Sequence, residues 1–367
     1  MSSPEVRDRR LAAGLVAWFE KAARDLPWRA RAGDDRPDAY RVLVSEIMLQ
    51  QTQAARVAER FERFMSRFPT PAALAEADEQ DVLAEWSGLG YYRRARLLHA
   101  AAGVIVERHG GAVPGDPAAL RALPGVGVYT AGAVASLAFG LAEPAVDGNV
   151  VRVVLRLEND PRSQAGPETQ HRVTDRVRLL LHASRDPGAL NESLMELGAT
   201  VCTPAAPRCD ACPLADLCKA RAVGTQEEIP PPKPRAKRRV LYAASLLATD
   251  ADGRVLLRRR PATGLWAGMW EPPTLERDDR HARRGELAQH LGPALADADL
   301  TDAGAFTHLT THREVRFRVY AASIRHEETP DGCAWVEDLD AVGLGSAQRR
   351  VLSFATGAVA TRSPSGR

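Results

Sequence analysis

The chain has 367 residues, enough for two domains, and 45% of them are hydrophobic, so each domain can bury an ordinary core. The formal net charge of +2 excludes attraction of a polyanion over the whole surface, so any nucleic-acid site must be a local patch. No stretch reads as a membrane span, and residues 11–19 are too short for a signal peptide, so we expect a cytoplasmic protein.

Residues 14 to about 220 read as a series of short helices. Within residues 57–68, apolar side chains recur at helical spacing, and arginines and glutamates occupy the opposite face. A longer helix is predicted from Tyr91 to His109, because two glycines follow it. No strand pattern interrupts this region, so we predict an all-α domain over residues 1–222.

The segment VSEIMLQQTQ places one carboxylate, Glu46, inside an apolar run. A buried, unpaired carboxylate is costly to ionise, so we expect its pKa to be raised. A glutamine-rich turn that includes Gln51 and Thr52 follows it.

The segment LPGVGVYTAG predicts a tight turn between two helices, formed by Gly125, Val126 and Gly127. Such a turn directs backbone N–H groups outward at a helix N-terminus, which suits a DNA phosphate. An ordinary αα-hairpin is the alternative for this motif alone. Twenty residues after Gly127 comes Asp147, which we expect to cap the next helix, and capping does not exclude a catalytic role.

Four of the five cysteines fall within residues 202–218. They are Cys202, Cys209, Cys212 and Cys218. In a chain without a secretory signal, this clustering indicates a metal centre rather than disulfides. The spacing alone leaves both a structural zinc ion and an iron–sulfur cluster open.

The composition changes after the cysteines. Residues 223–239 combine a proline run with a basic run, which predicts a stiff linker. Over residues 240–358 we predict a smaller α+β domain, with a β-hairpin around Asp252-Gly253, a strand at 313–324 and a short helix at 286–292. We expect residues 359–367 to be a disordered tail.

Together these motifs resemble the helix–hairpin–helix DNA glycosylases that carry an iron–sulfur cluster. The match covers about residues 15–221, and LPGVG, VDGNV and the four-cysteine spacing occur in the family's order. The resemblance implies a [4Fe–4S] cluster on the four cysteines and double-stranded DNA as the partner, bound by a monomer.

Two subfamilies differ at Tyr129 and Glu46. The endonuclease III-like enzymes carry a nucleophilic lysine at the position of Tyr129 and a glutamine at that of Glu46. This chain has neither, and its segments VSEIMLQQTQ, GLGYY and MELGATVCTP are similar to those of the MutY-type adenine glycosylases. The resemblance therefore implies excision of adenine opposite 8-oxoguanine or guanine.

In this family a protonated acid donates to adenine so that the base departs neutral, and Glu46 fits that role. Asp147 would stabilise the oxocarbenium-like sugar, either by its charge or by a transient covalent bond. Asn149 and Tyr129 would position groups around the sugar.

Recognition residues follow from the same resemblance. Gln51, with Thr52 beside it, is the candidate wedge in the base stack, and Tyr91 or Tyr92 would stack nearby. The adenine pocket would draw on Trp28, Arg29 and Glu192. Core packing remains an alternative for Trp28 and for one of the two tyrosines.

The C-terminal domain resembles a Nudix domain at TGLWAGMWEPP, residues 263–273. Residues 280–292 lack the paired acids that a Nudix hydrolase uses to bind metal, so we expect no hydrolysis. The resemblance implies that the triplet Phe306-Thr307-His308 contacts 8-oxoguanine, although a β-edge segment without this role is the alternative.

Three other functions stay open at this point. An endonuclease III-like glycosylase with lyase activity would form a borohydride-trapped adduct with DNA. A non-catalytic iron–sulfur DNA-binding protein would not need both Glu46 and Asp147. A nucleotide pyrophosphatase would need the missing acids.

Overall fold

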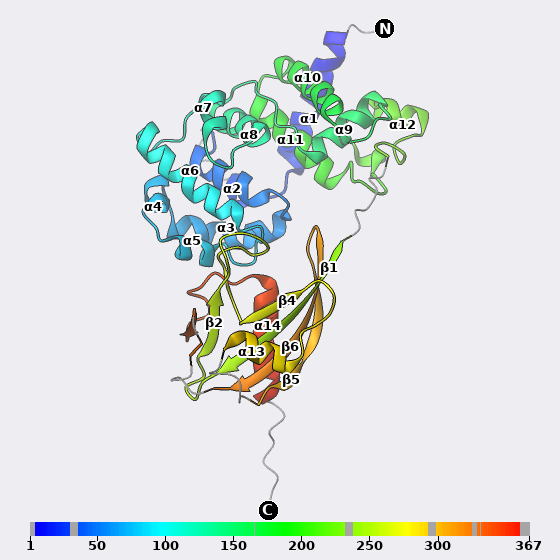
Figure 1. Cartoon of the computed structure of the whole chain (residues 1–367). Helices are drawn as coiled ribbons and strands as arrows, with labels where there is room; N and C mark the ends of the chain where they lie inside the picture. Colours follow the sequence, from blue (N-terminus) through cyan, green and yellow to red (C-terminus); the bar gives the residue numbers. More distant parts are fainter. Residues whose placement is uncertain are drawn as a thin grey trace, which may run out of the picture. The chain divides into compact units, whose positions relative to one another are not determined.

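The computed structural model describes residues 4–29, 36–164, 166–231, 238–292, 299–324, 329–330 and 332–359. The chain divides into two compact units. Unit 1 comprises Met1–Glu76 and Leu97–Pro234, and unit 2 comprises Ala77–Arg96 and Arg235–Arg367. Figure 1 traces the elements of both, and each unit is described by itself.

Unit 1 is helical, and its described residues contain no strand, which confirms the predicted all-α region. Its helices are α1 (Pro4–Ala22), α2 (Ala39–Leu49), α3 (Ala54–Arg67), α4 (Pro71–Ala75), most of α6 (Arg93–His109), α7 (Pro117–Ala122), α8 (Val128–Phe139), α9 (Gly148–Glu158), α10 (Pro167–Ala183), α11 (Pro187–Thr200) and α12 (Lys219–Val223). Single 3₁₀ turns lie at η1 (Pro27–Arg29), η2 (Cys209–Ala211) and η3 (Ala215–Leu217). The long helix predicted from Tyr91 is confirmed as α6, which begins two residues later.

Helices α1, α9, α10 and α11 share one core, in which Leu15, Val154 and Leu194 are fully or almost fully buried. The predicted apolar face of α3 is confirmed, because Val57 and Phe61 are buried on it. Helix α8 packs closely on its neighbours through small residues. A Cβ on Gly132 of α8 would overlap the carbonyl oxygen of Pro144.

The predicted linker is shorter than residues 223–239. Ile229 is buried in the core of unit 1, and its carbonyl oxygen accepts a hydrogen bond of 2.7 Å from Arg156 Nε. Residues 223–231 therefore belong to unit 1, since an apolar side chain anchors them there. Residues 232–237 lie outside the described part of the chain, and β1 begins at Arg239.

Unit 2 is built on a seven-stranded sheet. Its elements are α5 (Glu79–Glu85), β1 (Arg239–Thr249), β2 (Val255–Arg259), β3 (Trp270–Glu271), β4 (Thr274–Arg277), α13 (Arg284–Leu291), β5 (Thr301–Leu309), β6 (Arg313–Ser323), β7 (Cys333–Val336) and α14 (Ser346–Val359). The path is β3-β2-β1-β6-β5, and β4 and β7 pair with β1 and β2. The β1–β2 hairpin, the strand β6 and the helix α13 confirm the predictions, and β5 agrees with the β-edge segment given as the alternative for residues 306–308. The strands β3, β4 and β7 and the helix α14 have no counterpart among the predictions.

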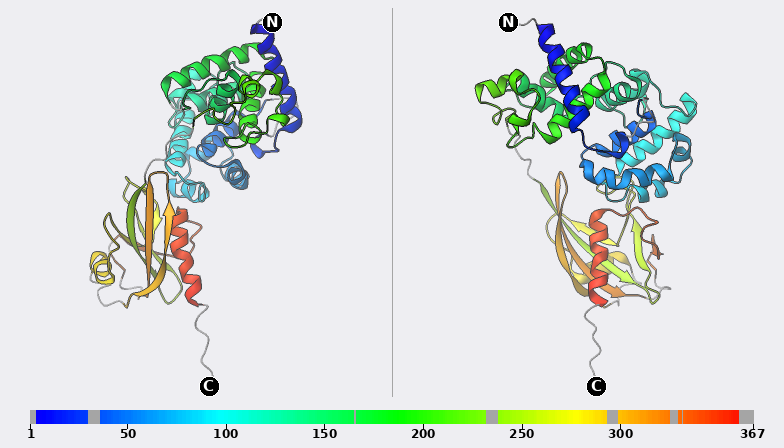
Figure 2. Two further views of the ribbon diagram at one scale, coloured as in Figure 1. Left: turned by 90° about the vertical axis from the view of Figure 1, so that its right-hand side faces the viewer. Right: turned by 180° about the vertical axis from the view of Figure 1, so that it is seen from behind.

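Two helices cover opposite faces of this sheet, as Figure 2 shows. Helix α14 contributes Val351 and Leu352 to the core on one face, and α13 contributes Leu287 and Leu291 to the core on the other. Both faces of the central strand β1 are therefore buried, which explains its continuous apolar run. The predicted tail begins at the last residue of α14, and residues 360–367 lie outside the described part.

The variant Gly132→Ala is expected to lower the free energy of unfolding by about 1–3 kcal/mol, because its Cβ has no room against the Pro144 carbonyl. Gly103→Ala in α6 is the matched control, since nothing lies within 4 Å of its Cβ and alanine favours the helix by up to about 1 kcal/mol. Urea denaturation measures both changes. Equal effects of the two variants would contradict the close packing of α8.

Candidate active site

One pocket of unit 1 collects predicted residues that lie far apart in the sequence. Those that line it are Trp28, Arg29, Glu46, Gln51, Thr52, Tyr129, Asp147, Asn149 and Glu192. They come from η1, α2, the turn after α2, α8, the start of α9, and α11. The structure therefore brings every predicted catalytic and adenine-pocket residue to one place.

Glu46 lies on α2 and is only 4% exposed. Its Oε2 atom has no hydrogen-bond partner among the described residues. The pKa of Glu46 is raised to about 7, chiefly by burial. The negative charges of Asp147 and Glu192 contribute to this increase, while the Tyr129 hydroxyl and Arg29 act in the opposite direction. The carboxyl is thus largely protonated just below neutral pH, as the apolar sequence context predicts.

Asp147 is the N-cap of α9, and its Oδ1 accepts the Val150 backbone N–H at 2.8 Å. Its Oδ2 accepts a second hydrogen bond from Asn149 Nδ2, also at 2.8 Å. Burial raises the pKa of Asp147, but these donors oppose the change because they stabilise the ionised form. The capping role and a position in the pocket therefore coexist.

Arg152, one turn further along α9, holds Asn149 in place. Its Nη2 donates to Asn149 Oδ1 at 2.9 Å and to the Gly198 carbonyl at 2.8 Å, and its Nε donates to the Cys202 carbonyl at 2.8 Å. One buried guanidinium thus connects the pocket to the first cysteine of the cluster loop.

Tyr129 enters the pocket from the first turn of α8. Its hydroxyl donates to Met195 Sδ at 3.1 Å and lies beside the Glu46 carboxyl, whose pKa it lowers. Burial, together with the nearby Glu46 charge, raises the pKa of Tyr129 well above its ordinary value. The phenol therefore stays neutral and acts as a hydrogen-bond donor beside the acid.

Trp28 and Arg29 form the 3₁₀ turn η1, and both line the pocket. The Trp28 ring is buried and meets Phe61 edge-on at 5.7 Å, so it also packs the core. Arg29 Nε contacts Glu192 Oε1 at 2.9 Å. The second glutamate of α11, Glu196, also binds Arg29 and was not predicted from the sequence.

The turn after α2 exposes Gln51, whose φ of 56° places it in the left-handed region. Such a backbone stores strain at an exposed site, which is common where a side chain is presented to a ligand. In the hairpin, Gly125 has a φ of 77°, and Gly127 caps α8 without a side-chain acceptor. The N–H groups at this helix start are thus not bound by a capping side chain, as the phosphate-site prediction requires.

In unit 2, Tyr92 is buried and donates to the Leu344 carbonyl at 2.8 Å, so it is a packing residue. Tyr91 is 46% exposed, with its hydroxyl 2.6 Å from Thr311 Oγ1. Of the two tyrosines predicted to stack, only Tyr91 has an available ring.

The triplet on β5 does not present all three side chains. Phe306 is buried and stacks on Phe317, with ring centroids 4.7 Å apart. His308 is half-buried beside Trp266, and Thr307 is exposed. Phe306 therefore belongs to the core, which corrects the prediction that its ring contacts a base.

The helix α13 carries one acid, Glu286, which is already bound. Its carboxylate accepts from both Arg280 Nη atoms at 2.8 and 2.7 Å and from the Arg283 backbone N–H at 2.7 Å. These donors hold the pKa of Glu286 far below its usual range. The acid caps its helix instead of facing an open metal site.

All four clustered cysteines line one small cavity, and none forms a disulfide. Arg156 Nη1 lies 3.4 Å from Cys202 Sγ at the cavity wall. Burial and the neighbouring thiols raise the pKa of Cys212 to about 12. No three His, Cys, Asp or Glu side chains within the described ranges are arranged to hold a metal ion.

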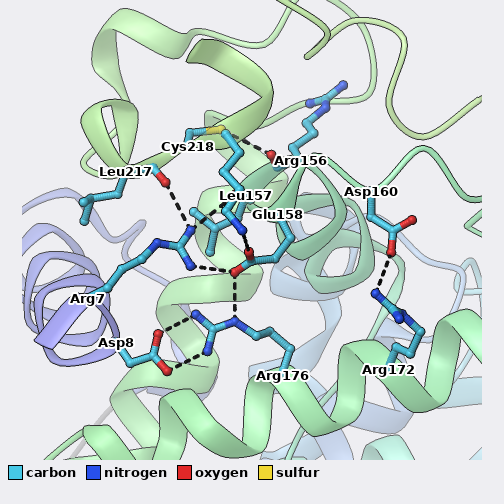
Figure 3. A network of polar contacts seen from close by, with 11 residues as sticks. Arg7, Asp8, Arg156, Leu157, Glu158, Asp160, Arg172, Arg176, Leu217 and Cys218 are labelled. Atoms are coloured by element: carbon cyan, nitrogen blue, oxygen red, sulfur yellow. Dashed lines mark hydrogen bonds and ion pairs between the residues drawn. The ribbon is translucent and has the colours of Figure 1, made fainter. Parts of the chain in front are cut away.

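A charged network holds the end of this loop to α9, as Figure 3 shows. Glu158 accepts from Arg7 Nη1 and Arg176 Nε, each at 2.9 Å, and from Lys219 Nζ at 2.6 Å. Arg7 Nη2 also donates to the Leu217 carbonyl at 3.3 Å. The residues on both sides of Cys218 are thus tied to one carboxylate.

Comparison with known proteins agrees with this arrangement. Residues 44–178 match the HhH-GPD superfamily of base excision DNA repair proteins, and residues 244–354 match the NUDIX domain. The adenine DNA glycosylase of Rattus norvegicus is 34% identical over 92% of this chain and 76% of its own length.

The chain belongs to the adenine DNA glycosylase family. The resemblance drawn from the sequence is confirmed. The adenine DNA glycosylase of Mycobacterium tuberculosis is 45% identical over 60% of this chain and 70% of its own length. A thermostable thymine-DNA glycosylase of known structure, 26% identical, aligns with a TM-score of 0.52 over 60% of this chain and all of its own.

Sequence reasoning missed two residues that line the pocket, Arg24 and Glu196, and also Arg152, which holds Asn149 from outside it. A signal existed for Glu196, because Glu192 and Glu196 are spaced four apart in an otherwise apolar helix and so lie on one face.

No helix among the described residues is long and apolar enough to cross a membrane.

The variant Tyr129→Phe is expected to raise the pKa of Glu46 above about 7, because the lost hydroxyl stabilises the ionised carboxylate. Carbon NMR titration of a glutamate-labelled protein measures this change. Tyr40→Phe, on the same helix α2, is the control, because its hydroxyl binds the Phe68 carbonyl instead. An unchanged or lower pKa of Glu46 in Tyr129→Phe would show that the Tyr129 hydroxyl does not stabilise the ionised Glu46 carboxylate.

Proposed function

We propose that this protein is a monomeric adenine DNA glycosylase of base excision repair that removes adenine paired with 8-oxoguanine or guanine. It hydrolyses the N-glycosidic bond of an adenine that has been flipped out of the duplex, which prevents G·C to T·A mutation. The supporting observation is the pairing, in one pocket, of a buried acid at Glu46 with the hydrogen-bonded carboxylate of Asp147. Its place of action is chromosomal DNA.

In the first step, Glu46 donates its proton to a ring nitrogen of adenine. The bond between the sugar C1′ and N9 breaks, its electron pair goes to the base, and adenine leaves as a neutral molecule. Asp147 lies across the pocket with both oxygens occupied by donors, so it offers negative charge to the oxocarbenium-like sugar.

In the second step, water adds to C1′ and transfers a proton to the Glu46 carboxylate, which restores the acid. Asn149 and Tyr129 position the groups around the sugar, since Asn149 already donates to Asp147 and Tyr129 lies beside Glu46 in the pocket. With no lysine in the hairpin, the reaction proceeds without a Schiff base.

Base flipping costs a few kcal/mol, and something must fill the vacated space. Gln51 has an exposed side chain on a strained turn, and Thr52 lies beside it in the pocket wall. The hairpin at Gly125, Val126 and Gly127 would bind the DNA backbone at the start of α8. Of Tyr91 and Tyr92, Tyr91 is the residue whose ring would stack on a base.

Recognition of 8-oxoguanine is assigned to Thr307 and His308 of β5. Thr307 presents a hydroxyl to solvent, and His308, which points to the other side of the strand, is half-buried beside Trp266. Burial and the charge of Arg350 lower the pKa of His308, so its ring is neutral at physiological pH and can accept as well as donate.

The four cysteines would hold a [4Fe–4S] cluster. The cluster is larger than a single ion and takes one thiolate per iron, which fits four thiols that line one cavity. When bound, it supplies a rigid cross-link between η2, η3 and the end of α11. The chain itself contributes Arg156, whose Nη1 lies 3.4 Å from Cys202 Sγ.

The deciding experiment measures release of labelled adenine from a duplex with adenine opposite 8-oxoguanine, with an A·T duplex as the control. The wild type should be fast at about pH 6 and slow as the pH rises through about 7, because the protonated Glu46 is lost there. Glu46→Gln should bind DNA and lose about 10²–10⁴-fold in excision rate.

Excision by Glu46→Gln at the wild-type rate would refute this mechanism. Efficient trapping of a covalent adduct by borohydride would instead favour a lyase of the endonuclease III type.

The variant Glu158→Gln is expected to loosen the cluster loop, because it weakens the contacts of Arg7, Arg176 and Lys219. These contacts lower the pKa of Glu158 to about 2, so their stabilisation is present above about pH 4.5 and is lost as the pH falls toward 2. The visible absorbance of the purified protein should bleach several-fold faster with a chelator at neutral pH.

Asp175→Asn on α10 is the control, since its partners His171 and Arg178 are exposed. Bleaching of Glu158→Gln at the control rate would show that the network does not hold the loop.

A further inference from the structure

Helix α11 directs two carboxylates, one turn apart, at the same arginine. Arg29 Nε contacts Glu192 Oε1 at 2.9 Å, and Arg29 Nη2 contacts Glu196 Oε2 at 3.0 Å. Glu196 is also bound by Arg24, with Arg24 Nε at 2.7 Å and Nη2 at 2.9 Å, and by the Arg24 backbone N–H at 3.2 Å. The result is a ladder of alternating charges, Glu192–Arg29–Glu196–Arg24, which we call the charge ladder.

The two carboxylates of the charge ladder are buried, whereas Arg24 at its end is 42% exposed. The side chain of Glu196 is 1% exposed and that of Glu192 is 7% exposed. Arg29 Nη1 donates to the Arg24 carbonyl at 3.0 Å, and its guanidinium lies 4.9 Å from the centre of the Phe19 ring. A buried charge is costly unless it is paired. Removal of one charge from the ladder therefore favours new ion pairs for the charges that remain.

The charges that face Glu46 come from four elements: Tyr129 on α8, Asp147 at the start of α9, Glu192 on α11 and Arg29 on η1. Glu192 raises the pKa of Glu46, whereas Arg29 lowers it. While Arg29 is paired with Glu192, these two effects on the pKa of Glu46 partly cancel. An arginine released from α11 would find Glu46 and Asp147 as the next carboxylates in the same pocket.

We propose that Glu196 is a positioning residue that, with Arg24, anchors Arg29 on α11 and so prevents the guanidinium from pairing with the acid Glu46. Glu196 touches neither the base nor the sugar in this scheme. The inference rests on the proposed excision of adenine, and it adds the reason why an arginine is tolerated beside a group that must stay protonated. It also assigns a function to Arg24 that the adenine pocket alone does not require.

The test is the pH profile of adenine excision under single-turnover conditions, with full-length protein and the 8-oxoguanine duplex. In Glu196→Gln the shape is kept and the negative charge is removed, so the Arg29 guanidinium is held by Glu192 alone and can turn toward Glu46, where it stabilises the ionised carboxylate. The alkaline limb of this profile is the range in which the excision rate falls as the pH rises. It should shift to lower pH by about one unit, which is about a tenfold loss of rate near pH 8. The rate at low pH and the affinity for DNA should stay close to those of the wild type.

Glu168→Gln is the matched control, because it removes a carboxylate from an exposed pair with Arg162 and should leave the profile unchanged. Glu196→Asp keeps the charge and should restore much of the wild-type profile. If Glu196→Gln does not fold, Arg24→Lys serves instead, since it keeps the charge, loses the two-point contact and should shift the limb in the same direction.

A uniform loss of rate at every pH, with no shift of the alkaline limb, would overturn the proposal, because it indicates only a structural role. Failure of the wild type to release adenine would instead refute the proposed function itself, so the two failures are distinguishable.

Discussion

Burial of the Glu46 carboxyl is the constraint around which the helical unit is organised. An acid that is 4% exposed, with one oxygen lacking a partner among the described residues, is a proton donor near neutral pH only if nearby charges are controlled. Asp147 lies in the same pocket, and its charge favours the protonated form of Glu46. The hydrogen bonds that Asp147 accepts favour its own ionised form, against the effect of its burial, so they also help to keep Glu46 protonated.

Helix α9 connects the pocket that holds Glu46 and Asp147 to the cysteine loop and to the neighbouring helices. Its N-cap is Asp147, its first turn holds Asn149, and Arg152 and Arg156 follow at successive turns toward the cysteine loop. The N-terminal end of α9, which lines the pocket, therefore belongs to the same helix that binds the cysteine loop. At its C-terminal end, Glu158 forms ion pairs with Arg7 of α1 and Arg176 of α10. A distortion of the loop would reach the pocket through one rigid helix and not through a flexible segment.

The sequence predicted the parts of the site that local motifs encode. Capping residues, the glycine turn and the acid in an apolar helix each depend on neighbours a few positions away, and the structure places Glu46, Tyr129 and Asp147 together as expected. The charge ladder could not be predicted in this way, because Arg24 and Glu196 are 172 positions apart and meet only through packing of α1 and α11. The strand β5 was expected only as an alternative for residues 306–308, because it is an edge strand with little apolar alternation, and its pairing with β6 defines it more than propensity does.

Strand geometry decides how the C-terminal unit can read a base. Successive side chains of β5 point to opposite faces, so three adjacent residues cannot all contact the same ligand. Phe306 pairs with Phe317 and is buried under α14, which directs Thr307 outward. Leu309, two residues further on the same face, is 57% exposed. Under the proposed function, 8-oxoguanine bound on this face would contact the Thr307 hydroxyl and the apolar side chain of Leu309, while buried Phe306 fixes the register that exposes them.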